Sequence, residues 1–177
     1  MVMLDFPRLR QSHSYDCGAL ATQAVLEYYG FDVREDKVMK MEKTNKSGTR
    51  PKKIFGVLKK YNLKPKMEKF KISDVKRFIK NGHPVILIIQ AWTDRKKIDW
   101  EKDWKDGHYV VAIGFDKNKM YFEDPSSVLK TYMTFKELEK RWHDAESTKK
   151  KGKKYIHCGI VVSGKKKYDG RKIIKLD

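Results

Sequence analysis

The sequence has few of the residues that define several whole classes of protein. Two cysteines, Cys17 and Cys158, are too few for a disulfide framework and lack the paired spacing of a metal site. Only 11 glycines and 5 prolines occur in 177 residues, which excludes collagen-like and low-complexity chains. The longest apolar run, residues 85–89, is far shorter than the ~20 residues that a membrane helix needs.

The N-terminus also lacks the features of an export signal, because residues 1–8 contain no basic segment followed by an apolar stretch. Hydrophobic residues make up 40% of the chain and aromatic residues 12%, which is enough to build a core. We therefore expect one soluble, cytosolic domain over residues 1–177. We expect no bound cofactor, no metal and no integral membrane segment.

Positive charge dominates the composition. Lysine and arginine total 41 against 23 acidic residues, so the formal net charge is +18. Such an excess favours acidic partners: nucleic acid, an anionic membrane face or an acidic peptide. No zinc-finger spacing, RNA-recognition aromatic motif or helix-turn-helix signature accompanies it, so nucleic acid is possible but not favoured.

The hydrophobic period changes along the chain. Residues 17–28 repeat apolar side chains at the i, i+3, i+4, i+7 spacing of an amphipathic helix. From residue 84 onward, β-branched runs indicate strands. Further helices are expected at 32–43, 51–61, 73–80 and 134–142, strands at 84–90, 109–115, 120–123 and 155–163, and a final hairpin at 165–176. Helices before strands predict an α+β fold with an antiparallel sheet.

A long segment, residues 91–107, separates two predicted buried strands. It carries Trp92, Trp100 and Trp104 among charged residues. Loops of this length in a compact domain are usually functional or mobile. Two interpretations stay open: the tryptophans anchor the loop to the surface, or they form a wall of a substrate-binding cleft.

Cys17 lies in the first turn of the first predicted helix. A cysteine on an apolar helix face is most often a small core residue. A helix N-terminus, however, also stabilises a thiolate. Gly18 leaves room beside it for a substrate backbone, and Gln11 can donate a side-chain N–H to an oxyanion. Acyl transfer by a thiol needs this combination.

A general base and an orienting carboxylate would have to come from the later strands. Among the five histidines, His108 opens a buried strand directly after Gly107. Asp124 ends the next strand and can accept a hydrogen bond from the imidazole if the two strands pair. Each residue also has a purely structural interpretation. His108 can be a surface histidine or a core histidine with its hydrogen bonds satisfied, and Asp124 can belong to an Asp-Pro turn that ends the strand.

Three motifs, in this order, resemble the double-glycine (bacteriocin-processing) peptidase domain, a papain-like cysteine peptidase family. They are residues 11–19 (QSHSYDCGA) followed by 27–30 (EYYG), residues 107–111 (GHYVV), and residues 122–125 (FEDP). The similarity covers about residues 6–163. It implies a papain-like fold in which N-terminal helices pack on an antiparallel β-sheet.

The resemblance also implies a role for each matching residue. Gln11 would supply the oxyanion donor, Cys17 the nucleophile, His108 the general base and acid, and Asp124 the orienting group. Gly18 and Gly107 would border the substrate. The best-known family members are N-terminal domains of peptide-exporting transporters. With no membrane span and no phosphate-binding Gly-rich Lys motif, this chain would be a stand-alone relative.

The leading hypothesis is therefore a thiol peptidase that cleaves after Gly-Gly-type leader sequences. We expect a peptide or protein substrate with acidic residues near a small or apolar cleavage site. Three alternatives remain: a peptide-binding module with an idle thiol, an enzyme that transfers acyl groups or hydrolyses a small amide, and a basic nucleic-acid-binding protein.

Overall fold

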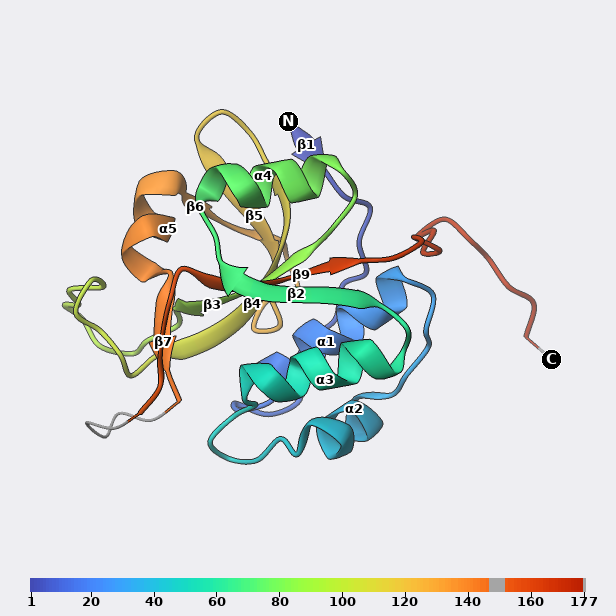
Figure 1. Cartoon of the computed structure of the whole chain (residues 1–177), viewed down its shortest axis with the longest axis horizontal. Helices are drawn as coiled ribbons and strands as arrows, with labels where there is room; N and C mark the ends of the chain where they lie inside the picture. Colours follow the sequence, from blue (N-terminus) through green and yellow to red (C-terminus); the bar gives the residue numbers. More distant parts are fainter. Residues whose placement is uncertain (147–151, 177) are drawn as a thin grey trace.

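A long antiparallel sheet crosses the middle of the protein in the computed structural model, which describes residues 1–146 and 152–176 (Figure 1). Its strands lie in the order β2 (Lys64–Lys69), β9 (Cys158–Ser163), β3 (Val85–Gln90), β4 (Gly107–Phe115), β5 (Lys119–Glu123) and β6 (Thr131–Thr134). A short β1 (Val2–Met3) pairs with β4, and β7 (His143–Ala145) pairs with β8 (Lys154–Ile156) in a separate ribbon.

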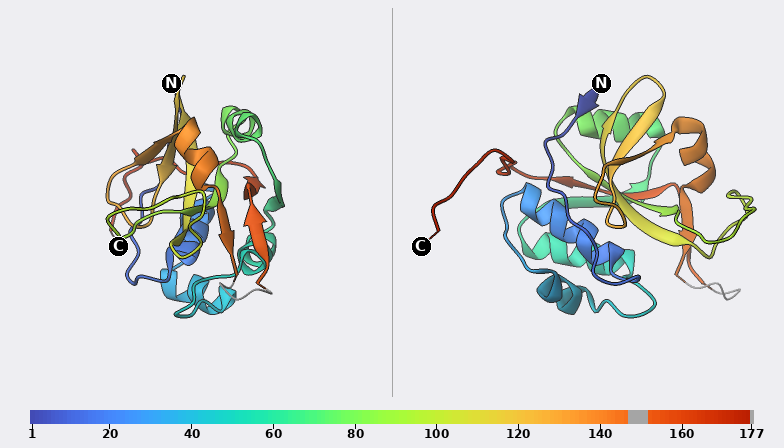
Figure 2. Two further views of the ribbon diagram at one scale, coloured as in Figure 1. Left: turned by 90° about the vertical axis from the view of Figure 1, so that its left-hand side faces the viewer. Right: turned by 180° about the vertical axis from the view of Figure 1, so that it is seen from behind.

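Helices cover both faces of this sheet (Figures 1 and 2). One layer contains α1 (Cys17–Tyr28), α2 (Glu35–Glu42) and α3 (Pro51–Lys60), and the opposite layer contains α4 (Ile72–Lys80) and α5 (Phe135–Arg141). The mixed α+β architecture with a large antiparallel sheet confirms the predicted fold class. Among the described residues, no helix is long and apolar enough to cross a membrane.

The central strand β3 shows why its sequence is continuously apolar. Ile86 and Ile88 belong to the core beneath α1–α3, whereas Val85, Leu87 and Ile89 belong to the core beneath α4 and α5. All five side chains are almost fully buried. Burying each one contributes about 1.5–3 kcal/mol, so this strand ties the two helical layers to one sheet.

Strand pairing brings distant parts of the sequence to one edge of the fold. In the β3–β4 pair, Ile89 lies opposite His108 and Gln90 opposite Gly107. In the β4–β5 pair, Val111 lies opposite Glu123. The start of β4 and the end of β5 are therefore neighbours, as the interpretation of His108 and Asp124 requires.

Four strands, β1, β2, β6 and β7, were not predicted, and the strand expected at 155–163 is divided into β8 and β9. One predicted element is wrong. Strand β2 is largely exposed and β6 is mostly half-buried, and polar residues interrupt the apolar pattern of both. The hairpin expected at 165–176 is absent: the described residues there contain a turn at Gly170 and Arg171 but no strand.

The backbone of the C-terminal segment bonds elsewhere. The N–H groups of Lys167 and Tyr168 both donate to the carbonyl of Tyr28 at the end of α1, 3.2 Å away. Beyond this contact the segment leads away from the rest of the protein, with Ile173 and Leu176 exposed (Figure 1). An isolated two-stranded hairpin is marginally stable in water, and no apolar face supports one here.

Candidate active site

Cys17 is the first residue of α1 and is buried, so the thiol combines a helix N-terminus with a desolvated position. The backbone N–H groups at a helix N-terminus have no intrahelical partners and favour negative charge. Gly18 packs so tightly that a Cβ atom on it would lie 2.8 Å from Cβ of Thr49. Only glycine therefore fits beside Cys17.

A buried pair of titratable side chains faces this helix start. Nε2 of His108 lies 2.7 Å from Oδ1 of Asp124, and the two side chains are 6% and 4% exposed. Burial by itself lowers the pKa of His108, but hydrogen bonds to Asp124 and to the Cys17 side chain outweigh it and raise that pKa to about 9. Because Nε2 is taken by Asp124, Nδ1 is the nitrogen available to Cys17.

The carboxylate of Asp124 is held from several directions. The backbone N–H of Ser126 donates to Oδ1 at 2.9 Å, and the hydroxyl of Thr131 donates to Oδ2 at 3.2 Å. Burial alone would raise the pKa of Asp124, but the bonds from His108, Ser126 and Trp92 hold it below its ordinary value. Asp124 therefore stays ionised and keeps the imidazole aligned.

Trp92 contacts this carboxylate directly. Its indole Nε1–H donates to Oδ2 of Asp124 at 3.0 Å, while 58% of the residue remains exposed. Its φ of 57° lies in the left-handed region, which is rare for a bulky residue and is typical of functional sites. Sequence reasoning assigned Trp92 to substrate binding and missed this contact, because no local pattern links it to Asp124.

Gln11 lies beside the segment that follows Asp124. Its backbone N–H donates to the carbonyl of Pro125 at 2.9 Å, and its side-chain oxygen accepts from the Ser126 hydroxyl at 3.2 Å. Its amide nitrogen donates to the carbonyl of His13 at 2.7 Å. A side-chain amide carries two N–H donors, so one remains for another acceptor.

A cavity of about 720 Å³ opens beside Cys17. Gly107, Tyr109 and Asp144 line it, together with the loop that joins α2 to α3. Tyr109 fixes that loop, since its hydroxyl donates to the carbonyl of Thr49 at 2.7 Å. The cationic side chains on the walls are Lys43, Lys46, Arg50, Lys53 and Lys105, and the acidic ones are Glu42, Asp144 and Glu146.

Trp100 and Trp104 lie elsewhere and are not among the residues that line this cavity. The guanidinium of Arg141 lies 3.8 Å from the Trp100 ring centroid. Trp104 packs on the ring of His143, with 4.5 Å between the ring centroids, and lines a second cavity of about 290 Å³. For these two residues the geometry favours the anchoring interpretation of the loop over the cleft-wall interpretation.

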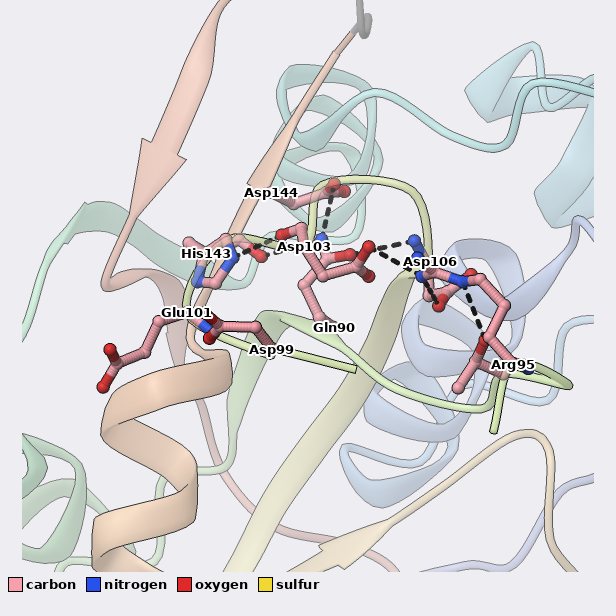
Figure 3. A network of polar contacts seen from close by, with 9 residues as sticks. Gln90, Arg95, Asp99, Glu101, Asp103, Asp106, His143 and Asp144 are labelled. Atoms are coloured by element: carbon pink, nitrogen blue, oxygen red, sulfur yellow. Dashed lines mark hydrogen bonds and ion pairs between the residues drawn. The ribbon is translucent and has the colours of Figure 1, made fainter. Parts of the chain in front are cut away.

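Polar contacts hold the same loop against the sheet (Figure 3). Arg95 forms ion pairs with Asp103, at 2.6 Å, and with Asp106. The backbone N–H of Asp106 donates to Oε1 of Gln90 at 2.9 Å. Since Asp106 immediately precedes Gly107 and His108, this network fixes the backbone that enters the candidate site.

One cluster contains side chains of the kind that bind metal ions. Ligand atoms of His13, Asp16 and Glu35 lie within 4.8 Å of one another. Burial and the neighbouring Asp16 carboxyl raise the pKa of Glu35. Nδ1 of His13 lies 2.9 Å from Oδ2 of Asp16, and the hydroxyl of Ser12 donates to Oε2 of Glu35 at 2.8 Å, so these side chains already have protein partners and we assign no metal to the cluster.

Residues 3–150 match the sequence profile described as the Peptidase_C39 like family. The chain belongs to the Peptidase C39-like family. This membership confirms the resemblance found in the sequence motifs. No curated protein matches the chain in sequence.

Solved structures of C39 peptidase domains share the fold. The peptidase domain of Streptococcus ComA, a bifunctional ABC transporter, superposes with a TM-score of 0.67 at 21% identity, covering 89% of this chain and 97% of that one. A C39-like peptidase from Bacillus anthracis gives a TM-score of 0.69 at 19% identity, covering 94% and 98%.

A third C39 relative carries a peptide. It is a double-glycine motif protease from an AMS/PCAT transporter, in complex with its leader peptide. Its TM-score is 0.67 at 18% identity, and the match covers 91% of this chain and 93% of that one. At these identities the three structures establish the C39 fold of this chain.

Proposed function

We propose that this protein is a cysteine peptidase with Cys17 as its nucleophile. The observation that carries the proposal is the buried hydrogen bond between His108 Nε2 and Asp124 Oδ1. It leaves Nδ1 available to a thiol at the N-terminus of α1. An imidazole oriented by a carboxylate can take the proton of the thiol, and the helix N-terminus stabilises the resulting thiolate.

We infer the following reaction, which these positions support. Cys17 transfers its proton to His108 and attacks the carbonyl carbon of the scissile amide. The oxyanion accepts hydrogen bonds from the free amide N–H of Gln11 and from backbone N–H groups at the start of α1. His108 returns the proton to the leaving amine, and a water molecule that it activates hydrolyses the thioester, releasing the acid and the thiol.

Small residues at the cleavage site are part of the proposed specificity. Gly18 packs against Thr49 and Gly107 against Asp144, so neither glycine position near the thiol has room for a side chain. The related double-glycine protease was solved with a leader peptide. We therefore include Gly-Gly-type sequences in the proposed specificity.

The proposed specificity also includes acidic residues farther along the substrate, because four lysines and one arginine lie on the cavity walls and would attract them. Attraction between exposed charges weakens with salt, since the Debye length is ~8 Å at physiological ionic strength. Cleavage of an acidic peptide should therefore lose its advantage over a matched neutral peptide as salt is added. An equal rate for both peptides at low salt would contradict this part of the proposal.

The decisive experiment is intact-mass analysis after treatment with a peptidyl electrophile. We expect one equivalent of label on the native protein, none on Cys17→Ala, and one on Cys158→Ala. Peptide binding without labelling of Cys17 would instead identify an idle binding module. Equal labelling of both thiols in the folded protein would disprove the assignment of the nucleophile.

A further inference from the structure

Asp144, in β7, places a carboxylate on the wall of the Cys17 cavity. The carboxylate lies directly against Gly107, because a Cβ atom added to that glycine would overlap it. Gly107 immediately precedes His108. A carboxylate that faces the cavity therefore lies next to the backbone that carries the proposed general base.

A buried amide holds this carboxylate in place (Figure 3). The side-chain nitrogen of Gln90 donates to Oδ1 of Asp144 at 3.0 Å and to the carbonyl of His143 at 3.1 Å. The oxygen of the same amide accepts from Asp106, and Gln90 is fully buried. With both ends of the amide engaged, the position of Asp144 is fixed before a substrate binds.

The other carboxylates of this network have cationic partners, and Asp144 differs from them. Asp103 and Asp106 pair with Arg95, Asp99 pairs with Lys102 at 3.0 Å, and Glu101 pairs with Lys140 at 3.4 Å. Within residues 1–146 and 152–176, no lysine or arginine forms an ion pair with Asp144, although the chain has a net charge of +18.

Among the residues that the structure describes, Asp144 is therefore a half-buried carboxylate without a cationic partner, which is costly, and such groups are concentrated at functional sites. Burial, followed by the nearby charge of Asp103, raises the pKa of Asp144 to about 6, with the Gln90 bond acting in the opposite direction. Glu146, the neighbouring acid on the cavity wall, already accepts a hydrogen bond from the hydroxyl of Tyr155. Glu42, the third acid on the wall, is 1% exposed and accepts a hydrogen bond from the Thr22 hydroxyl. Of the three, Asp144 is thus the acid best placed to meet a ligand.

We propose that Asp144 is a subsite carboxylate that binds a lysine or arginine side chain of the substrate, close to the scissile bond. This inference rests on the proposed peptidase function. The Asp144 carboxylate lies against Gly107, the residue before His108, and an extended chain advances ~3.3–3.6 Å per residue, so we place the cation within about three residues of the cleaved bond.

The lysines of the cavity wall do not oppose this assignment. Repulsion between exposed charges is screened over ~8 Å at physiological ionic strength, whereas a direct ion pair in a partly desolvated pocket is screened much less. The substrate would then combine one cation near the cleavage site with acidic residues toward the rim.

The test uses a peptide mixture prepared from denatured proteins with chymotrypsin, which leaves acidic and basic residues intact, so that no cleavage site is assumed. After incubation with the full chain, mass spectrometry reads the new termini. We expect cleavage to favour lysine or arginine over glutamine by about tenfold at one position within three residues of the cut, the usual size of a charge-assisted hydrogen bond.

Variants of the cavity-wall acids test which residue causes the enrichment of lysine or arginine. Asp144→Asn keeps the shape and the Gln90 contact, and it should abolish the enrichment. Glu146→Gln removes the other carboxylate and should retain it. If Asp144→Asn does not fold, Asp144→Ser provides the same comparison.

The outcomes separate the two proposals. Cleavage that depends on Cys17 but shows no enrichment of lysine or arginine overturns the role of Asp144 and leaves the peptidase intact. Enrichment that persists in Asp144→Asn also overturns it. Absence of any cleavage by the native protein contradicts both.

Discussion

Two regions of this protein contain the same kinds of residue in very different settings. The Cys17 region consists of Cys17, His108 and Asp124. The Cys158 region consists of Cys158, His157 and Glu139. In the first, the histidine and carboxylate are 2.7 Å apart with side chains 6% and 4% exposed. In the second, Nε2 of His157 lies 3.4 Å from Oε2 of Glu139, and the two side chains are 26% and 50% exposed.

The thiols differ as well. Cys17 begins a helix, whereas Cys158 begins strand β9, and burial raises the pKa of the Cys158 thiol. His157 stacks on Trp142, whose indole N–H donates to the carbonyl of Cys158 at 2.8 Å. From this comparison we propose that a cysteine, a histidine and an acid near one another in the fold are not sufficient for a nucleophile. A helix N-terminus and a buried, direct histidine–carboxylate bond distinguish the Cys17 region.

The largest expected difference lies between the two cysteines. Cys17→Ala should reduce peptide cleavage by about 10⁴-fold or more, since without the sulfur no thioester forms. Cys158→Ala should cleave at the native rate. Turnover of one peptide by both variants checks this, with circular dichroism to establish folding. Comparable activity in Cys17→Ala would break the contrast.

The two histidines should differ almost as much. His108→Ala removes the group that moves the proton in both half-reactions, so we expect a loss of about 10⁴-fold. His157→Ala should have little effect, because that ring is part of a surface contact. Steady-state kinetics of both variants measure the difference, and a large loss in His157→Ala would refute it.

The acids should show the next smaller difference. Asp124→Asn removes the charge that stabilises the imidazolium but leaves the proton carrier, so a loss of roughly 10²–10³-fold is expected, less than for His108→Ala. The pKa of His108, measured by NMR, should fall from about 9, because the Asp124 bond raises it. Glu139→Gln serves as the control and should leave both quantities unchanged.

Substitutions of Trp92 and Trp104 should affect kcat differently, because only Trp92 contacts Asp124. Trp92→Phe removes one hydrogen bond to the Asp124 carboxylate, which should lower kcat about tenfold and leave the fold intact. Trp104→Phe changes a ring that packs on His143, away from the Cys17 cavity, and should leave kcat unchanged. If the two variants behave alike, Trp92 does not position Asp124.

The smallest expected effect is on stability. The pKa of His108 is raised in the folded state from 6.5 to about 9. A raised histidine pKa contributes stability that is fully present below pH 6.5 and is lost as the pH rises through 9. Relative to His108→Ala, the native protein should therefore lose about 1–3 kcal/mol between pH 6 and 9.5. Urea unfolding at both pH values checks this, and a constant difference would contradict it.

Much of the fold could be predicted from local patterns. The apolar spacing of residues 17–28 predicts α1, and the uninterrupted apolar run of β3 predicts a strand buried on both faces, because side-chain period follows secondary structure. Strands β2 and β6 escaped prediction, since polar residues interrupt their apolar pattern. The prediction of a hairpin at 165–176 was wrong, because the aliphatic side chains of this segment are exposed and have no core to pack against.

The sequence by itself determined the order of the motifs, the place of Cys17 at a helix start, and the family. Only the tertiary structure decided that His108 bonds Asp124, that Trp92 holds this aspartate, and that Trp100 and Trp104 pack elsewhere. Asp144 also lines the Cys17 cavity, and no sequence motif predicted this position. Local sequence determines period and capping, whereas these contacts join residues that only strand pairing and core packing bring together.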